Sequence, residues 1–104
     1  MLSPKHVQTI VAKQYRLTRA QLVGKRRLPR IVLARHIAML LCLEELQGDA
    51  SLPQVGLWFH RDHTTVLAAR EKMRRRIAAD RKFAKEVDDL RQLISKAGCF
   101  SAAA

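Results

Sequence analysis

The sequence has few of the residues that build β-sheets and tight turns. Aromatic residues make up 5% of its 104 residues, and it contains only 4 Gly and 3 Pro. Because strands favour aromatic residues and turns favour Gly and Pro, this scarcity argues against a β fold. Long runs rich in Ala, Leu, Arg and Lys instead favour an all-helical domain. Hydrophobic residues make up 48%, which is enough for one folded domain with a modest core.

Cysteines and long apolar runs are also scarce. The 2 cysteines, Cys42 in an apolar run and Cys99 near the end, are too isolated for a disulfide framework. The longest apolar run, residues 37–43, is too short to span a bilayer, and no N-terminal stretch has a signal-peptide pattern. We therefore expect a cytoplasmic protein with reduced thiols and no membrane partner.

Acidic residues are outnumbered, with 9 Asp and Glu against 20 Lys and Arg, which gives a net charge of +11. Such a charge attracts polyanions, and taken alone it fits DNA, RNA or an anionic membrane. Its distribution is more informative, because residues 16–35 contain seven basic residues and no acid. These basic residues are Arg16, Arg19, Lys25, Arg26, Arg27, Arg30 and Arg35.

Helix-start signals and apolar residues at helical spacing predict a compact all-α bundle of five to six helices, formed by residues 1–104 as a single domain. Ser3 and Asp80 are suitable N-caps, and Thr18 and Ser51 each begin a capping-box pattern. The helix from about 30 to 47 has apolar residues on several sides, which predicts a central position. The other expected helices begin at Pro4, run over 18–24, 51–59 and 62–79, and extend from 80 to near Gly98, followed by a frayed tail at 99–104.

Residues 61–66, Arg-Asp-His-Thr-Thr-Val, follow a short predicted helix and a tight turn. Asp62 can cap a new helix, because its carboxylate can accept from the free N–H groups of the first turn. His63, Thr64 and Thr65 would then lie on that exposed turn. Short polar side chains at a helix N-terminus, one turn after another helix, suit insertion into the DNA major groove. The segment therefore predicts a helix-turn-helix.

Three further segments accompany this motif: Lys25-Arg26-Arg27, Arg-His-Ile-Ala-Met at 35–39, and Ser-Leu-Pro-Gln-Val-Gly at 51–56. With Arg-Asp-His-Thr-Thr-Val they make residues 7–93 resemble the DNA-binding domain of the bacterial replication initiator DnaA. The resemblance implies an all-helical, Trp-repressor-like bundle that reads a short asymmetric DNA box at replication origins and some promoters. Because the box is asymmetric, we expect a monomer.

The resemblance also implies roles for individual residues. Base contacts are implied for Asp62, His63 and Thr64 in the major groove, with Arg35 beside them, and for Arg27 in the adjacent minor groove. Phosphate contacts are implied at a second set of positions, which comprises Lys25, Arg26, His36, Leu52, Pro53, Arg61 and Thr65.

Several positions depart from the family pattern. Two glycines usually separate the Phe from Arg-Asp-His, whereas here only His60 lies between Phe59 and Arg61. We expect this shorter turn to lose the positive φ that Gly supplies, and to shift the recognition helix. His36 replaces a usual Gln, and Pro29 stands where a basic residue is common.

The initiator's ATPase motif, Gly-x-x-x-x-Gly-Lys-Ser/Thr, is absent from the sequence, so ATP hydrolysis by that route is not expected. Met1 followed at once by a capped helix favours a stand-alone relative over an excised domain. No catalytic arrangement, cofactor or small-molecule substrate is expected. His60 and His63 have a spacing that could hold a metal, but no further ligand set accompanies them.

The leading hypothesis is sequence-specific binding of double-stranded DNA at DnaA-box-like sites by a nucleoid-associated protein. Its role would lie in replication initiation, its regulation or transcription, with the full-length initiator as a further partner. The alternative is a protein-interaction module that uses Phe83, Val87, Leu90 and Ile94, although core packing explains that stripe better. RNA binding is a third hypothesis, and the scattered aromatics do not resemble a stacking platform. The basic run 72–76 fits a solvated helix face or outer phosphate contacts.

Overall fold

The computed structural model describes residues 3–46 and 51–103, and in the last helix it describes side chains as far as residue 96. These residues form six α-helices and no strand, which confirms the prediction of an all-α fold. The helices are α1 (Pro4–Gln14), α2 (Arg19–Val23), α3 (Pro29–Glu45), α4 (Leu52–Phe59), α5 (His63–Ala79) and α6 (Arg81–Ala103).

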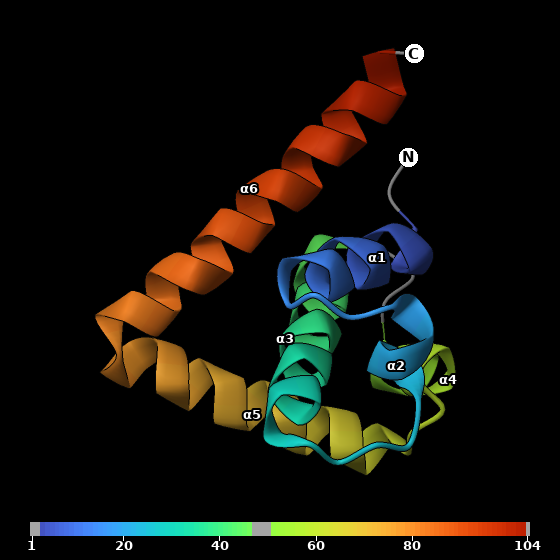
Figure 1. Cartoon of the computed structure of the whole chain (residues 1–104), viewed down its shortest axis with the longest axis vertical. Helices are drawn as coiled ribbons and strands as arrows, with labels where there is room; N and C mark the ends of the chain where they lie inside the picture. The colour runs from blue at the N-terminus through green and yellow to red at the C-terminus, as the bar shows by residue number, and fades with distance from the viewer. Residues whose placement is uncertain (1–2, 47–50, 104) are drawn as a thin grey trace.

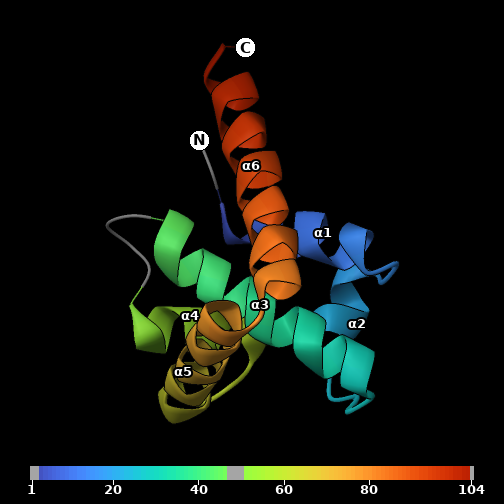
Figure 2. The same cartoon turned by 90° about the vertical axis from the view of Figure 1, so that its left-hand side faces the viewer.

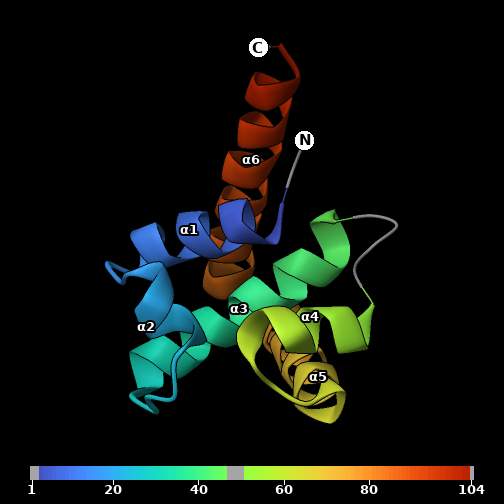
Figure 3. The ribbon, with the colours of Figure 1, turned by 90° about the vertical axis from the view of Figure 1, so that its right-hand side faces the viewer.

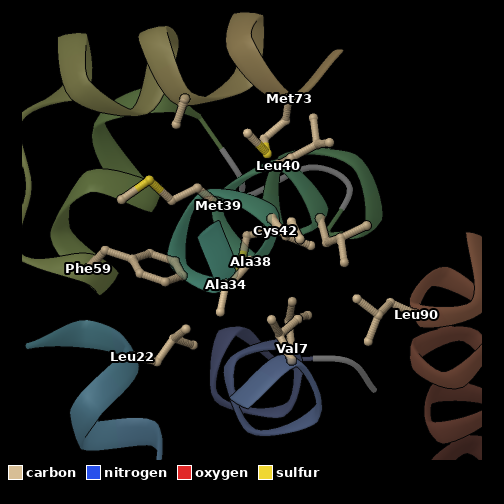
Figure 4. Close-up of a cluster of buried hydrophobic side chains, with 14 of the residues drawn as sticks. Val7, Leu22, Ala34, Ala38, Met39, Leu40, Cys42, Phe59, Met73 and Leu90 are labelled. Carbon is tan, nitrogen blue, oxygen red and sulfur yellow. The ribbon is translucent and has the colours of Figure 1, made fainter. Parts of the chain in front are cut away.

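Helix α3 lies in the middle of the molecule and packs against each of the other five helices (Figure 1). Every side chain from Ile37 to Cys42 is buried, so α3 is covered on all sides, as its sequence predicted. Burial also raises the pKa of the Cys42 thiol to about 12, which leaves it protonated and unreactive. Figure 4 shows the surrounding side chains that converge on α3, among them Val7 from α1, Leu22 from α2, Phe59 from α4, Met73 from α5 and Leu90 from α6.

Local side-chain hydrogen bonds fix the starts of α2 and α6. Thr18 and Gln21 form the predicted capping box of α2, with reciprocal bonds of 2.9 and 3.1 Å between side chain and backbone. Asp80 caps α6, because its carboxylate accepts from the backbone N–H groups of Lys82 and Phe83 at 3.0 and 3.2 Å. Two orphan donors at each helix start are thereby satisfied, as the sequence indicated.

The bounds of α3 differ by one or two residues from the expected ones, and the predicted end of α6 is wrong. α3 begins at Pro29, whose fixed φ suits the first helical position, and it ends at Glu45 rather than at residue 47, which lies outside the described residues. α6 does not end near Gly98 but continues to Ala103. A single Gly costs only about 1 kcal/mol in a helix, so Gly98 alone does not end α6.

Helix α6 crosses in front of α3 in Figure 2, and its C-terminal part projects beyond the other helices. Its apolar stripe, Phe83, Val87, Leu90 and Ile94, is buried in the core, which confirms core packing as the role of these residues. The Arg91 guanidinium also donates to the Glu44 carboxylate on α3 at 2.8 Å. Among the described residues, no helix is long and apolar enough to cross a membrane.

Gly56 on α4 lies against the backbone of the chain that leads into α5. Its carbonyl accepts from the Arg61 N–H at 2.8 Å, and a Cβ at this position would overlap the Arg61 carbonyl oxygen. Gly56 therefore allows a backbone approach that a residue with a side chain would prevent. The absence of a side chain here fixes how closely the turn folds back onto α4.

We expect Gly56→Ala to destabilise the fold by about 1–3 kcal/mol, because the new methyl group overlaps rigid backbone. Without that overlap, the same substitution inside a helix would be stabilising by about 1 kcal/mol. Urea unfolding measures whether the substitution lowers or raises the free energy of unfolding. Gln54→Ala, at an exposed position of the same helix, is the matched control. A stabilised Gly56→Ala variant would contradict the close approach.

Candidate nucleic-acid interface

Helices α4 and α5 form a helix-turn-helix joined by residues 60–62. The prediction that the shorter turn loses its positive φ is wrong, because His60 itself adopts the left-handed conformation with φ 55° and ψ 43°. The conformation is held by backbone bonds from His60 N–H to Leu57 and from Arg61 N–H to Gly56. The turn thus reverses the chain without glycine, at a cost of about 1 kcal/mol for a residue with a Cβ.

The first turn of α5 presents an exposed polar cluster made of Asp62, His63 and Thr64. The Asp62 and His63 side chains are 67% and 56% exposed. Asp62 is the N-cap residue by position, but the predicted carboxylate cap is wrong, since its side chain makes no cap hydrogen bond. Instead the carboxylate accepts from the Thr64 hydroxyl at 2.7 Å and lies 3.2 Å from His63 Nδ1. The Thr64 bond, and secondarily the His63 charge, lower the pKa of Asp62, so it remains an anionic acceptor.

The start of α4 supplies a second exposed edge. The Ser51 hydroxyl accepts from the Gln54 N–H at 3.3 Å, and Leu52 and Pro53 form the first turn of the helix. Pro53 is exposed and Leu52 is half-buried. The free N–H groups and positive dipole end of a helix start favour an anion, which makes this edge compatible with a phosphate.

The segment between α2 and α3, residues 24–28, carries the predicted basic loop. Lys25, Arg26 and Arg27 are all exposed. Figures 1 and 3 show that this loop and the start of α5 lie at the same end of the molecule, remote from the C-terminal end of α6. The fold therefore brings two of the sequence-predicted binding segments, which lie far apart in the chain, to one face.

Two arginines connect the loop to the helix-turn-helix by donating to the same carbonyl oxygen. Arg35 on α3 donates from Nη2 to the Gly24 carbonyl at 2.8 Å, and Arg61 donates from Nη2 to that oxygen at 2.7 Å. Arg35 also donates to the carbonyls of Leu22 and Arg26 at 2.7 and 2.9 Å. Arg61 also reaches the carbonyl of Phe59 at 2.9 Å. We call this arrangement the Gly24 junction.

The Gly24 junction gives Arg35 and Arg61 a structural role that the sequence did not predict. Arg35 is only 4% exposed, and its guanidinium is directed at backbone carbonyls rather than into solvent. Base contact by Arg35 and phosphate contact by Arg61 remain predictions, since no contact in the structure tests them. Their local sequence looks like that of exposed basic residues, and only the long-range fold reveals their acceptors.

A basic cleft of about 560 Å³ lies between the loop, α3 and the start of α5. Burial lowers the pKa of His36 below its ordinary value of 6.5, and the positive charges of Lys72, Arg35 and Arg61 lower it further. His36 is therefore largely neutral at pH 7, although the side chains around it are positively charged. The polar and charged residues that line the cleft are Lys25, Arg27, Arg35, His36, Arg61 and Thr65.

The sequence indicated Lys72 only as part of the basic run 72–76, and it did not single out Leu57. Lys72 follows Thr65 by two helical turns on α5, and its charge acts on His36 in the cleft. The seven-residue spacing of Thr65 and Lys72 could have indicated that they share a helix face. Leu57 on α4 is 71% exposed, and a single exposed Leu gives no usable signal in the sequence.

Comparison with known proteins finds the same family that the motifs indicated. Residues 4–73 match the family described as bacterial DnaA protein helix-turn-helix. The chain is 44% identical over 92 residues to the chromosomal replication initiator protein DnaA of Corynebacterium jeikeium, a match that covers 88% of the chain and 15% of that relative. The corresponding protein of Latilactobacillus sakei is 42% identical over 91 residues, covering 86% and 20%. That of Rhizobium meliloti is also 42% identical over 91 residues, covering 86% and 18%.

The chain thus spans between 15% and 20% of the length of these relatives. The matched part includes the helix-turn-helix and the basic loop. The match does not cover the remaining length of these relatives.

We expect Arg35→Lys to destabilise the fold by about 1–3 kcal/mol. The planar guanidinium reaches three backbone carbonyls at once, and a lysine ammonium cannot reproduce that geometry. The loss should be accompanied by faster hydrogen exchange at residues 24–28. Urea unfolding and amide exchange measure both effects. Arg30→Lys, at an exposed position of the same helix, makes the same charge-conserving replacement and should leave the stability unchanged. Equal effects of the two substitutions would contradict a structural role for Arg35.

Proposed function

The chain belongs to the bacterial DnaA helix-turn-helix family, and on that premise we propose that it binds double-stranded DNA sequence-specifically at DnaA-box-like sites. The observation that carries the proposal is the exposed polar first turn of α5 beside a basic loop fixed by the Gly24 junction. A recognition helix supplies base contacts in one groove, and an adjacent arginine-bearing loop can reach the neighbouring groove.

In the proposed complex, Asp62, His63 and Thr64 face the base edges of the major groove. The anionic Asp62 carboxylate suits a cytosine amino group. The Thr64 hydroxyl already donates a hydrogen bond to Asp62, so the Thr64 methyl group is the part that can contact a thymine methyl. Arg27, exposed on the loop, enters the minor groove, where a narrow A·T segment attracts a guanidinium.

Phosphate contacts would flank these base contacts on both sides. Lys25 and Arg26 on the loop would neutralise one backbone segment, and His36 and Thr65 at the cleft would contact the same segment. The first turn of α4, with Leu52 and Pro53, would hold another through its helix dipole. Such binding weakens steeply with salt, because each neutralised phosphate releases counterions. For Arg61 we propose a contact with phosphate made in addition to its bond to Gly24.

The relatives are chromosomal replication initiator proteins, so we extend the proposal to a role in replication initiation, its regulation or transcription. Because a DnaA box is asymmetric, the chain would bind it as a monomer. A full-length initiator could meet it at shared boxes, as a competitor or as a partner. Counting origins per cell at controlled expression of the chain measures that role.

We expect selection from a random duplex library to recover one asymmetric motif, and Asp62→Ala and Thr64→Ala to relax it at single positions. Each loss of a base contact should weaken binding to the selected duplex by about 1–3 kcal/mol. Lys25→Ala should weaken binding to all duplexes about equally and reduce the salt dependence. Fluorescence anisotropy with selected and scrambled duplexes separates the two classes of effect.

Lys85→Ala, at an exposed position of α6 away from the cleft, removes the same charge and serves as the matched control. It should leave both the motif and the affinity close to those of the parent chain. Binding without any recovered motif would reduce the proposal to non-specific attraction of DNA by a basic surface.

A further inference from the structure

The cleft between the basic loop, α3 and α5 has a neutral imidazole surrounded by fixed positive charge. We infer that this cleft is a phosphate site in which His36 takes up a proton when a DNA phosphodiester occupies it, so that the chain binds DNA more tightly as the pH falls below neutrality. The inference rests on the proposed DNA-binding function. It adds a titratable ligand and a direction of pH dependence that the helix-turn-helix does not imply.

The charges that face His36 come from every element around the cleft and all have one sign. Arg35 lies beside it on α3, Arg61 comes from the turn before α5, and Lys72 comes from α5. Lys25 and Arg27 face the cleft from the loop, and no carboxylate lines it. In the free chain these cations disfavour a further positive charge on the imidazole.

A bound phosphodiester changes this balance. A negative charge placed among these cations offsets their repulsion and stabilises the imidazolium form. The cleft has a volume of about 560 Å³, which is roomy enough for a phosphate group with water. The exposed Thr65 at its edge supplies a hydroxyl donor that suits the same phosphate. The pKa of His36 therefore rises on binding, from its lowered position in the free chain.

The sign of the effect follows from proton linkage. Between the lowered pKa of the free chain and the higher pKa of the complex, the complex binds more protons than the separated molecules. DNA affinity therefore increases as the pH falls through that window, by at most about tenfold per pH unit for one proton. Well above the pKa of the complex, His36 is neutral in both states and the affinity becomes independent of its titration.

The stability of the free chain should respond in the opposite direction. The pKa of His36 in the folded chain lies below its ordinary value of 6.5, so the unfolded chain binds the proton more readily. Acidification through this range therefore destabilises the free fold while it strengthens DNA binding. These opposite responses distinguish a titrating group in the binding site from one that simply holds the fold together.

The test measures the Kd of the chain for its selected duplex by fluorescence anisotropy from pH 5.5 to 8.0 at constant ionic strength. For the parent chain we expect Kd to decrease several-fold to tenfold from pH 8.0 to 5.5. His36→Gln keeps a polar donor but cannot be protonated, so its Kd should lose most of this dependence. His6→Gln, at an exposed position of α1 outside the cleft, should retain the parent's dependence. Retention of the full dependence by His36→Gln would overturn the inference.

A second measurement needs no variant, so it remains decisive if His36→Gln folds poorly. The ring resonances of His36 are titrated by NMR in the free chain and in the complex with the duplex. We expect the titration midpoint to rise on binding, and calorimetry in two buffers of different ionisation enthalpy to show net proton uptake near pH 6.5. An unchanged midpoint would contradict the phosphate site.

The NMR titration midpoints also distinguish proton uptake by His36 from proton uptake by His63, whose Nδ1 already lies 3.2 Å from the Asp62 carboxylate. A rise confined to His63 would place the proton uptake at the base-contacting turn and overturn the inference. If the chain binds no duplex at any pH, the proposed function itself fails. If it binds with pH-independent affinity, the proton uptake by His36 is overturned while the proposed function stands.

Discussion

The carbonyl oxygen of Gly24 accepts from two arginines, and the arrangement of the DNA-facing surface depends on it. Arg35 reaches it from the central helix at 2.8 Å, and Arg61 reaches it from the helix-turn-helix at 2.7 Å. A carbonyl oxygen has two lone pairs, so one oxygen can accept both bonds. The end of α2, the basic loop and the start of α5 are thereby joined at one atom. A shift of the recognition helix would have to carry the loop with it or break a charge-assisted bond.

The parts of the fold that could be predicted from the sequence are those set by local signals. The capping box of Thr18 and Gln21, the cap at Asp80 and the apolar stripe of α6 act within a few helical turns, and the structure confirms them. The two arginines could not be predicted in the same way. The acceptor that they share lies 11 residues from Arg35 and 37 from Arg61. The local sequence cannot distinguish an arginine that donates to backbone carbonyls from an exposed arginine that is available to bind a phosphate.

The turn before α5 shows how a connection without glycine can still include a positive φ. Sequence reasoning treated positive φ as a property of the missing glycines, whereas the structure requires only that one residue adopt it. His60 does so, and Arg61 donates from Nη1 to the carbonyls of Phe59 and His60 at 2.9 and 3.3 Å. These bonds offset the strain of about 1 kcal/mol that a side chain meets in the left-handed region. Arg61 thus stabilises the turn and, through Gly24, its position against the loop.

The same charges couple stability to binding. A net charge of +11 on 104 residues repels itself in the compact state, and the cleft concentrates that repulsion around His36. The buried α3 and the backbone carbonyls at Gly24 oppose it in the free chain, because core packing and carbonyl dipoles do not require a counter-charge. A polyanion relieves the repulsion directly. Removing a cleft cation should therefore favour the free fold and disfavour the complex, except at Arg35 and Arg61, where the loss of three backbone bonds outweighs the relief. These two arginines thus differ in structural role from the exposed Lys25 and Arg27 of the same cleft.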